Sequence, residues 1–403
     1  MERDIYSNIY KLYIIKIAKW FMLIMPIIAL FYNHHGLNDF QMLVVQATYS
    51  LSIVVFEIPS GYIADLWGRK NTLVFGTICG SLGYVIYSCT SHFWGFLTAE
   101  LILGIGESFV SGADSAMLYD SLVHLQTTEK YLKLEGRITA VGSFAETIAS
   151  SIGGALAVFA GLRAPFIAQA LVASIGIPAA LTLFEPNREM ISEKASFKHV
   201  LSIFQKSLFH DLRLSSALVL SSIAGCATLT MAWVAQLIFV HHHLTETNTT
   251  ILWVCLNLCV AMVSMFAAHI HGIIGSKTVF WAIIIALPCA YLAIPLPSSF
   301  IIVLAILFLF YIIRGLATPI LKEQVNTRCT SDVRATVLSI RSLLIRLLFS
   351  AVGPAIGWIA IKHNFNYALF SYGIILIISL MASAYFFIRF DKKITVKLES
   401  DMK

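Results

Sequence analysis

About twelve apolar runs, most of them near 20 residues long, constrain this 403-residue chain more than any other feature of its sequence. A helix of about 20 residues crosses the hydrocarbon core of a bilayer. The expected spans are 12–31, 41–63, 71–89, 93–117, 138–160, 165–184, 214–239, 249–270, 278–296, 299–319, 335–361 and 367–388. The sequence therefore predicts an all-α membrane protein and not a membrane β-barrel, whose strands are short alternating segments.

Composition leads to the same class of protein. Hydrophobic residues make up 58% of the chain and charged residues 12%, whereas a soluble globular protein carries about 25% charged residues. The first apolar run, 12–31, is too long for a signal peptide, contains Lys16 and Lys19, and is followed by no small-residue cleavage site. We expect a retained span whose two lysines snorkel to the membrane interface.

The longest polar stretch, 185–213, separates six expected spans from six. We expect an N-terminal six-helix bundle at 1–184, a cytoplasmic linker at 185–213, and a C-terminal six-helix bundle with a short tail at 214–403. A weak repeat relates the halves, because a shift of 207 positions places Gly68 on Gly275. The repeat predicts two pseudo-symmetric bundles.

Basic residues are distributed unevenly between the loops. The odd-numbered loops contain only Arg163 and Lys362, while the even-numbered loops and both tails hold most of the other lysines and arginines. By the positive-inside rule, the even loops and both termini are cytoplasmic. The net charge of +6 reflects this bias and does not indicate a nucleic-acid partner. We expect a multi-pass protein of the inner, or plasma, membrane.

A charged, glycine-punctuated turn follows the second span, with the pattern Gly61-x-x-x-Asp65-x-x-Gly68-Arg69-Lys70. The glycines permit tight turning and close backbone approach. The aspartate can accept hydrogen bonds from the N-terminal amides of a helix in the other half, where the helix dipole favours an anion. The two basic residues can bind carboxylates or lipid phosphates. Such contacts predict a cytoplasmic gate, which Asp114 and Asp120 could join.

This spacing resembles the loop between helices 2 and 3 of the major facilitator superfamily of secondary transporters. The lead-in Glu57-Ile-Pro59-Ser60-Gly61 also looks like many bacterial members. The resemblance implies two six-helix bundles that rock about a central cavity lined by spans 1, 4, 7 and 10. Two motifs depart from the family. Glu100-Leu-Ile-Leu-Gly104 stands where many proton-coupled members carry Arg-x-x-x-Gly, and span 5 lacks the proline of the drug-antiporter signature.

Several ionisable residues lie within the expected spans. Glu100, Glu107 and Asp114 are spaced seven residues apart on 93–117, which predicts one helix face, and Glu146 lies on 138–160. A charge at the bilayer centre costs about 2.5–3.5 kcal/mol. These groups must therefore face an aqueous cavity or each other.

The second half carries charges of the opposite sign. The internal repeat places Arg314 opposite Glu107 and Arg346 opposite Glu146, and Arg341 lies on the same span as Arg346. The pairs could lock one state of a transporter, or they could be fixed structural ion pairs. Alternatively, the arginines bind a carboxylate or phosphate of a substrate, and a desolvated glutamate carries a proton.

We expect a secondary transporter that exports a drug or metabolite as a proton antiporter, using Glu107 and also Glu146. The acidic face of 93–117 would suit a cationic or amphipathic substrate. The alternative is proton-coupled uptake of an anionic solute, such as an organic acid or siderophore, held by Arg314 and Arg346. A non-transporting membrane receptor or scaffold is a third hypothesis.

The sequence indicates no enzyme. It contains no Walker lysine motif, no recognisable catalytic constellation and no cysteine pair at metal-ligand spacing. The clusters at 34–35 and 241–243 are histidines, which we interpret as solvated loop residues. We expect no cofactor and no metal; the expected partners are a small-molecule substrate, protons and the lipid bilayer, and the expected state is a monomer.

Overall fold

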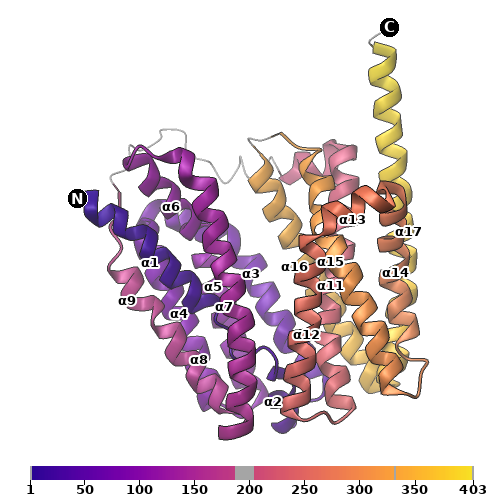
Figure 1. Ribbon diagram of the computed structural model, residues 1–403, viewed down its shortest axis with the longest axis horizontal. Helices are drawn as coiled ribbons and strands as arrows, with labels where there is room; N and C mark the ends of the chain where they lie inside the picture. The colour runs from indigo at the N-terminus through magenta and orange to yellow at the C-terminus, as the bar shows by residue number, and fades with distance from the viewer. Residues whose placement is uncertain (1, 187–203, 331–332, 402–403) are drawn as a thin grey trace. The chain divides into compact units, whose positions relative to one another are not determined.

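The computed structural model describes the backbone of residues 2–186, 204–330 and 333–401; the side chains at 2, 3, 65, 132, 335 and 392–401 lie outside the description. Regular structure in these residues is helical (Figure 1). Eleven helices are long and apolar enough to cross a membrane. Two compact units can be distinguished: unit 1 comprises 1–194 with 239–254, and unit 2 comprises 195–238 with 255–403. Most of the expected linker, 187–203, lies outside the described residues, and the expected domain boundaries stay a prediction.

The helices of the N-terminal half belong to unit 1. They are α1 (Glu2–Trp20), α2 (Ile28–His34), α3 (Asp39–Trp67), α4 (Arg69–Cys89), α5 (Phe93–Val110), α6 (Ala113–His124), the 3₁₀ turn η1 (Thr128–Lys130), α7 (Tyr131–Ala160), α8 (Ala164–Ser174) and α9 (Gly176–Leu181).

The helices of the C-terminal half belong mainly to unit 2, although the end of α11 and the start of α12 group with unit 1. They are the π-helical turn η2 (Lys206–His210), α11 (Leu212–His241), α12 (Glu246–Met265), α13 (Ala267–Ile274), α14 (Ser276–Ala293), α15 (Phe300–Asn326), α16 (Arg334–Lys362) and α17 (Phe365–Asp401). In Figure 1, α17 continues beyond the other helices of its unit.

The first expected span, 12–31, is interrupted. The helix stops at Trp20 and resumes at Ile28, with Pro26 in the irregular stretch between them. Irregular backbone at membrane depth is tolerated only where its polar groups find partners inside the protein. The fully buried Gln169 supplies one, because its Oε1 accepts a hydrogen bond from the Leu23 amide at 2.7 Å.

The expected span 93–117 is also broken. The chain leaves helical geometry after Val110, and Gly112 adopts φ +79°, a left-handed conformation that glycine takes at little cost. Asp114 therefore begins a second helix, α6. The prediction that Glu100, Glu107 and Asp114 share one face of a continuous helix is wrong for Asp114, because single glycines do not reveal a break from sequence alone.

Small residues hold α5 against α3 and α4. A Cβ added to Gly106 would lie 2.9 Å from the carbonyl oxygen of Gly76, and one added to Gly104 would lie 2.6 Å from the Cβ of Ser52. The Ser52 hydroxyl also donates to the Leu101 carbonyl at 2.9 Å. In lipid, close packing and interhelical hydrogen bonds drive helix association. These contacts fix the helix that carries Glu100 and Glu107.

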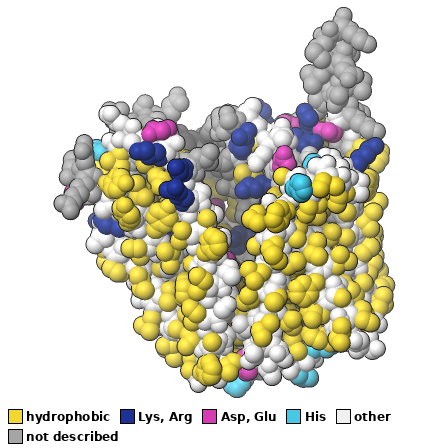
Figure 2. Space-filling model, viewed as in Figure 1, with side chains coloured by type: hydrophobic (Ala, Val, Ile, Leu, Met, Phe, Trp, Pro, Cys, Tyr) yellow, Lys and Arg dark blue, Asp and Glu magenta, His cyan; other side chains and the backbone are white. Residues whose placement is uncertain are grey.

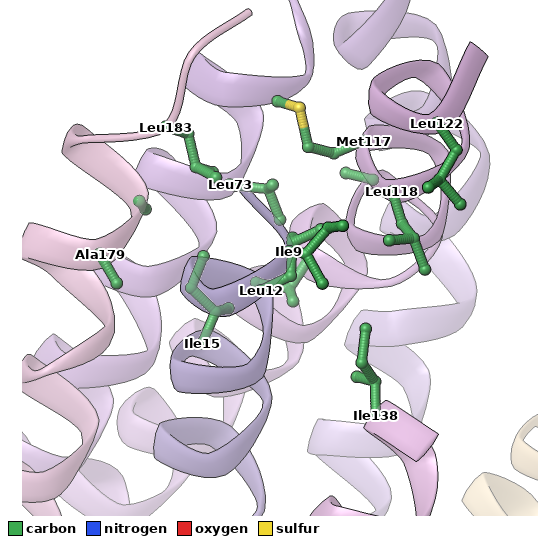
Figure 3. Close-up of a cluster of buried hydrophobic side chains, with 13 residues drawn as sticks. Ile9, Leu12, Ile15, Leu73, Met117, Leu118, Leu122, Ile138, Ala179 and Leu183 are labelled. Carbon is green, nitrogen blue, oxygen red and sulfur yellow. The ribbon is translucent and has the colours of Figure 1, made fainter. Parts of the chain in front are cut away.

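A separate cluster of buried apolar side chains lies within unit 1 (Figure 3). It joins residues of α1, α4, α5, α6, α7 and α9, and Leu73, Met117 and Leu118 within it are fully buried. Leu12 of α1 and Leu183, just after α9, close the cluster. This packing fixes α1, which carries Lys16 and Lys19, beside α6.

In unit 2, α15 is anchored to α12 around a proline. Pro319 has no amide hydrogen, so the Gly315 carbonyl four residues earlier lacks its usual helical donor. The Ser264 hydroxyl fills this role at 2.8 Å. A Cβ on Gly315 would lie 2.9 Å from the Cβ of Val263 and 3.0 Å from the Val260 carbonyl oxygen, so the two helices pack closely here. The contact fixes the neighbouring Arg314.

The surface agrees with a membrane environment. On the face in Figure 2, hydrophobic side chains cover most of the helices of each unit, and lysines and arginines gather toward one end. Large apolar side chains such as Phe159, Leu171, Met265 and Ile301 are more than 60% exposed. Lipid chains are the solvent in which such a surface is stable.

Candidate functional site

The most buried acid of the described spans is Glu100 on α5, with 5% of its surface exposed. Its Oε1 accepts hydrogen bonds from the Tyr87 hydroxyl at 2.6 Å and the Gln46 amide at 3.1 Å, and the Tyr32 hydroxyl lies at 3.4 Å. The Gln46 amide also donates to Tyr32, whose hydroxyl contacts that of Tyr87. The carboxyl group is thus surrounded by neutral donors on α2, α3 and α4.

Aromatic rings enclose this group. Tyr87 stacks on Phe96 with centroids 5.5 Å apart and lies 5.4 Å from Phe166, which stacks on Phe31 at 3.9 Å. These three phenylalanines are fully buried. Water is therefore kept from Glu100 in this conformation, and its charge is balanced only by hydrogen bonds.

The other two acids of the predicted span have lysine partners on α1. Lys19 Nζ lies 2.9 Å from Glu107 Oε1, and Lys16 Nζ lies 3.2 Å from Asp114 Oδ2. The four side chains are 12–22% exposed. The expectation that both lysines snorkel to the interface is wrong, because each finds a carboxylate one helix away, and pairing is less costly than an unpaired charge in the membrane.

The turn between α3 and α4 binds an anion within unit 1. Gly68, with φ +91°, precedes α4, and the Glu185 carboxylate accepts hydrogen bonds from the backbone amides of Arg69 and Lys70 at 2.9 and 2.7 Å. Arg69 Nε lies 3.8 Å from Asp120 Oδ2. The positive end of the α4 dipole favours such an anion.

This arrangement contains only some of the residues of the predicted gate. The structure brings together Gly68, Arg69, Lys70 and Asp120, and it adds Glu185. Gly61 lies within α3 with open space beside its Cα, and Asp114 belongs instead to the lysine pairs. The side chain of Asp65 lies outside the described side chains, so its contact with the other half stays a prediction.

In unit 2, Arg314 projects from α15 beside Tyr311, one turn earlier. Its guanidinium carbon lies 5.2 Å from the centroid of the Tyr311 ring. Among the described residues, Arg314 Nη1 has no hydrogen-bond partner, and the buried Tyr311 hydroxyl interacts with the Arg314 guanidinium but has no acceptor for its own hydrogen. The two groups are adjacent donors within a span.

The remaining predicted residues lie on the expected helices. Arg341 on α16 donates from Nε to the Ser221 hydroxyl on α11. Glu146 on α7 and Arg346 on α16 are half-buried. The predicted pairs Glu107–Arg314 and Glu146–Arg346 join different units, and they stay predictions.

No group of three or more His, Cys, Asp or Glu is placed to hold a metal ion in the part of the chain that the structure describes.

The histidine cluster 241–243 lies at the end of α11 and in the loop after it. Burial, together with the neighbouring His241 and His243, lowers the pKa of His242.

Sequence reasoning missed the neutral partners of Glu100 and the role of Glu185. Tyr32, Gln46 and Tyr87 come from three helices, and no spacing in the sequence connects them. The ion pairs of the lysines could have been expected from the sequence, because Lys16 and Lys19 lie inside an apolar run, where an ionised group needs a partner.

Comparisons with known proteins are consistent with this fold. The family model for the Major Facilitator Superfamily matches residues 13–354. An uncharacterized MFS-type transporter of Methanocaldococcus jannaschii is 23% identical over 202 residues, covering 49% of this chain and 50% of the relative. The inner membrane transport protein YajR of Escherichia coli is 32% identical over 162 residues, covering 38% and 34%. Multidrug resistance protein 2 of Bacillus subtilis is 26% identical over 153 residues, covering 38% and 37%. These matches span half or less of the relatives' length.

Solved structures agree over nearly the whole chain. The nucleoside transporter NupG has a TM-score of 0.76 at 13% identity, covering 94% of this chain and 99% of that one. A bacterial homolog to the human lysosomal transporter Spinster has a TM-score of 0.74 at 14% identity, covering 96% and 97%. At such identities the likeness concerns the fold. The expected all-α membrane fold with twelve spans in two bundles is confirmed, although several of the spans, including 12–31 and 93–117, are interrupted helices.

Proposed function

This chain belongs to the Major Facilitator Superfamily, and from that premise we propose that it is a proton-coupled secondary transporter of a small organic solute that works by alternating access. We place it in the inner membrane with both termini cytoplasmic, as the basic loops indicate. The surroundings of Glu100 are the observation that carries the proton coupling.

The balance of free energies around Glu100 makes its charge depend on conformation. An ionised group at the membrane centre costs about 2.5–3.5 kcal/mol, and a hydrogen bond to a charged group contributes about 1.5–3 kcal/mol. The bonds from Tyr87 and Gln46 therefore offset part of the cost of the ionised form. A conformation that withdraws either donor favours proton uptake, which links protonation to the movement of α3 and α4.

Glu107 is less suited to this role than the sequence indicates. Its carboxylate already has the Lys19 ammonium group as a partner at 2.9 Å. The argument for a cationic drug also loses its support, because Glu107 and Asp114 already hold lysines.

The turn at Gly68–Lys70, with Glu185 and Asp120, supports a gate at the expected cytoplasmic end of unit 1.

Purified protein in proteoliposomes tests the proposal. With an imposed pH gradient and a pH-sensitive dye inside, a panel of organic acids, cations and neutral solutes is added outside, and solute-dependent proton movement is measured. The wild type should move protons with at least one class of solute. Glu100→Gln should lose this movement while retaining solute exchange without a gradient. Glu129→Gln, an exposed change of the same chemistry, is the control.

Infrared difference spectroscopy gives a readout that needs no substrate. The carbonyl stretch of a protonated carboxylic acid should appear on acidification and vanish in Glu100→Gln. Unchanged proton coupling in Glu100→Gln would refute its role. A wild type that moves no protons with any solute would favour the receptor or scaffold hypothesis.

A further inference from the structure

Three arginines lie within the spans of unit 2. Arg314, Arg341 and Arg346 lie in the apolar parts of α15 and α16. The sequence from Arg334 to Phe390 contains no Asp or Glu, and in α15 the only acid is Glu323, near its end. In unit 1, by comparison, Glu107 and Asp114 have lysine partners inside the same unit.

Arg314 is the arginine with the clearest unmet bonding capacity. In the described part of the chain its Nη1 is buried with no hydrogen-bond partner, and the Tyr311 hydroxyl, which interacts with the Arg314 guanidinium, has no acceptor for its own hydrogen. Arg341, by comparison, donates to Ser221. Residues three apart on a helix lie on the same face, so Arg314 and Tyr311 offer two unsatisfied donors side by side.

The contact with the Tyr311 ring alone does not offset the cost of placing Arg314 within the membrane. A cation over an aromatic ring contributes about 0.5–2 kcal/mol, whereas an arginine at the membrane centre costs about 2.5–3.5 kcal/mol. Two buried donors without partners add about 1–3 kcal/mol each to the cost. A ligand that accepts hydrogen bonds from both groups would remove this free-energy cost.

The surrounding structure holds the two donors in place. Gly315 packs on Val263, and Ser264 bonds the Gly315 carbonyl, which fixes the turn of α15 that carries Arg314. The Tyr291 hydroxyl donates to the Ala227 carbonyl at 2.7 Å, and no hydrogen bond joins it to Tyr311 in the described part of the chain. Donors that are fixed before a ligand arrives lose little entropy on binding.

We infer that Arg314 Nη1 and the Tyr311 hydroxyl bind a carboxylate or phosphate group of the transported solute, so that the substrate is an organic anion. This inference rests on the proposed function. Guanidinium and phenol groups donate and do not need to give up a proton, and both match the acceptor oxygens of such a group. Recognition of the anion then belongs to unit 2, while proton binding belongs to Glu100 in unit 1.

Binding to the purified full-length protein tests the inference without a pH gradient. Thermal stabilisation is titrated with benzoate, with phenyl phosphate, and with benzamide as the neutral counterpart of benzoate. Benzoate or phenyl phosphate should stabilise the wild type saturably and benzamide should not; which of the two acts distinguishes a carboxylate from a phosphate site. A short-chain phosphatidic acid separates a lipid headgroup from a soluble solute.

Two variants and a matched control locate the site. Arg314→Gln should raise the midpoint concentration of the anion at least tenfold, and Tyr311→Phe, which removes only the hydroxyl, should raise it by a smaller factor. Arg389→Gln is the control, because Arg389 also lies over a tyrosine, Tyr385, but on an exposed part of α17. It should leave the midpoint unchanged.

The inference is overturned if no anionic probe stabilises the wild type, or if Arg314→Gln and Arg389→Gln bind anions equally well. Preferential binding of phosphatidic acid would also overturn it, because the site would then hold lipid and not a solute. Since binding is measured without proton flux, failure of the coupling experiment on Glu100 leaves this result unaffected, and the two proposals fail separately.

Discussion

The ion pair between Lys19 and Glu107 provides a quantitative test of how charge is stabilised in unit 1. In Lys19→Met the apolar stem is kept and the ammonium group is removed, so Glu107 loses a partner at 2.9 Å. Removing one partner of a buried pair costs about 3–5 kcal/mol, because the remaining charge is left in a medium of low polarity. The two side chains are 17% and 22% exposed, so we expect the lower end, about 3 kcal/mol.

A double-mutant cycle separates this cost from the loss of packing. Lys19→Met and Glu107→Gln should each destabilise the purified protein, and the double variant should recover most of the loss because no unpaired charge remains. Thermal unfolding followed by intrinsic fluorescence measures the effect, at about 2–4 °C per kcal/mol for a unit of 150–250 residues. The reasoning is refuted if the double variant is as unstable as the sum of the single variants, since the pair would then contribute no coupling energy.

Three further changes test the packing that positions the site. Gln169→Leu removes the acceptor of the Leu23 amide and should destabilise by about 1–3 kcal/mol in thermal unfolding, because a backbone donor is left unpaired in the break between α1 and α2. Gly106→Ala should cost about 1–3 kcal/mol, since the added methyl would lie 2.9 Å from the Gly76 carbonyl, whereas Gly61→Ala, which meets open space, should not destabilise. Ser264→Ala leaves the Gly315 carbonyl without its donor; anion binding should weaken while Arg314 itself is intact, and unchanged binding in the titration would contradict the role of this contact.

The sequence was sufficient to predict which segments cross the membrane, because hydrophobicity over about 20 residues is a strong signal. It did not predict where helices break inside those segments. Pro26 and Gly112 are compatible with continuous helices in lipid, and whether the chain bends depends on partners such as Gln169, which is distant in the sequence. Boundaries of apolar runs are therefore predictable while their interruptions are not.

The same limit applies to the candidate site. Spacing identified the charged residues, because ionisable groups in apolar runs are rare and costly. It could not identify their partners, because the lysine that binds Glu107 lies 88 positions earlier and the donors around Glu100 come from α2, α3 and α4. The internal repeat suggested arginines of the second half instead. A repeat indicates equivalent depth, but it does not specify contact.

Two kinds of charge stabilisation can be distinguished among the membrane-embedded residues of the two units. In unit 1, Glu107 and Asp114 have lysine partners, whereas the described hydrogen bonds of Glu100 come from neutral groups, so we propose Glu100 as the acid that takes up a proton. In unit 2, Arg314 has a cation–π contact and an unpaired donor, and an arginine does not release its proton at physiological pH, so its charge is removed only by an anion. The chemistry of the two side chains thus assigns different ligands to them: Glu100 can take up a proton, and Arg314 requires an acceptor that arrives with the solute.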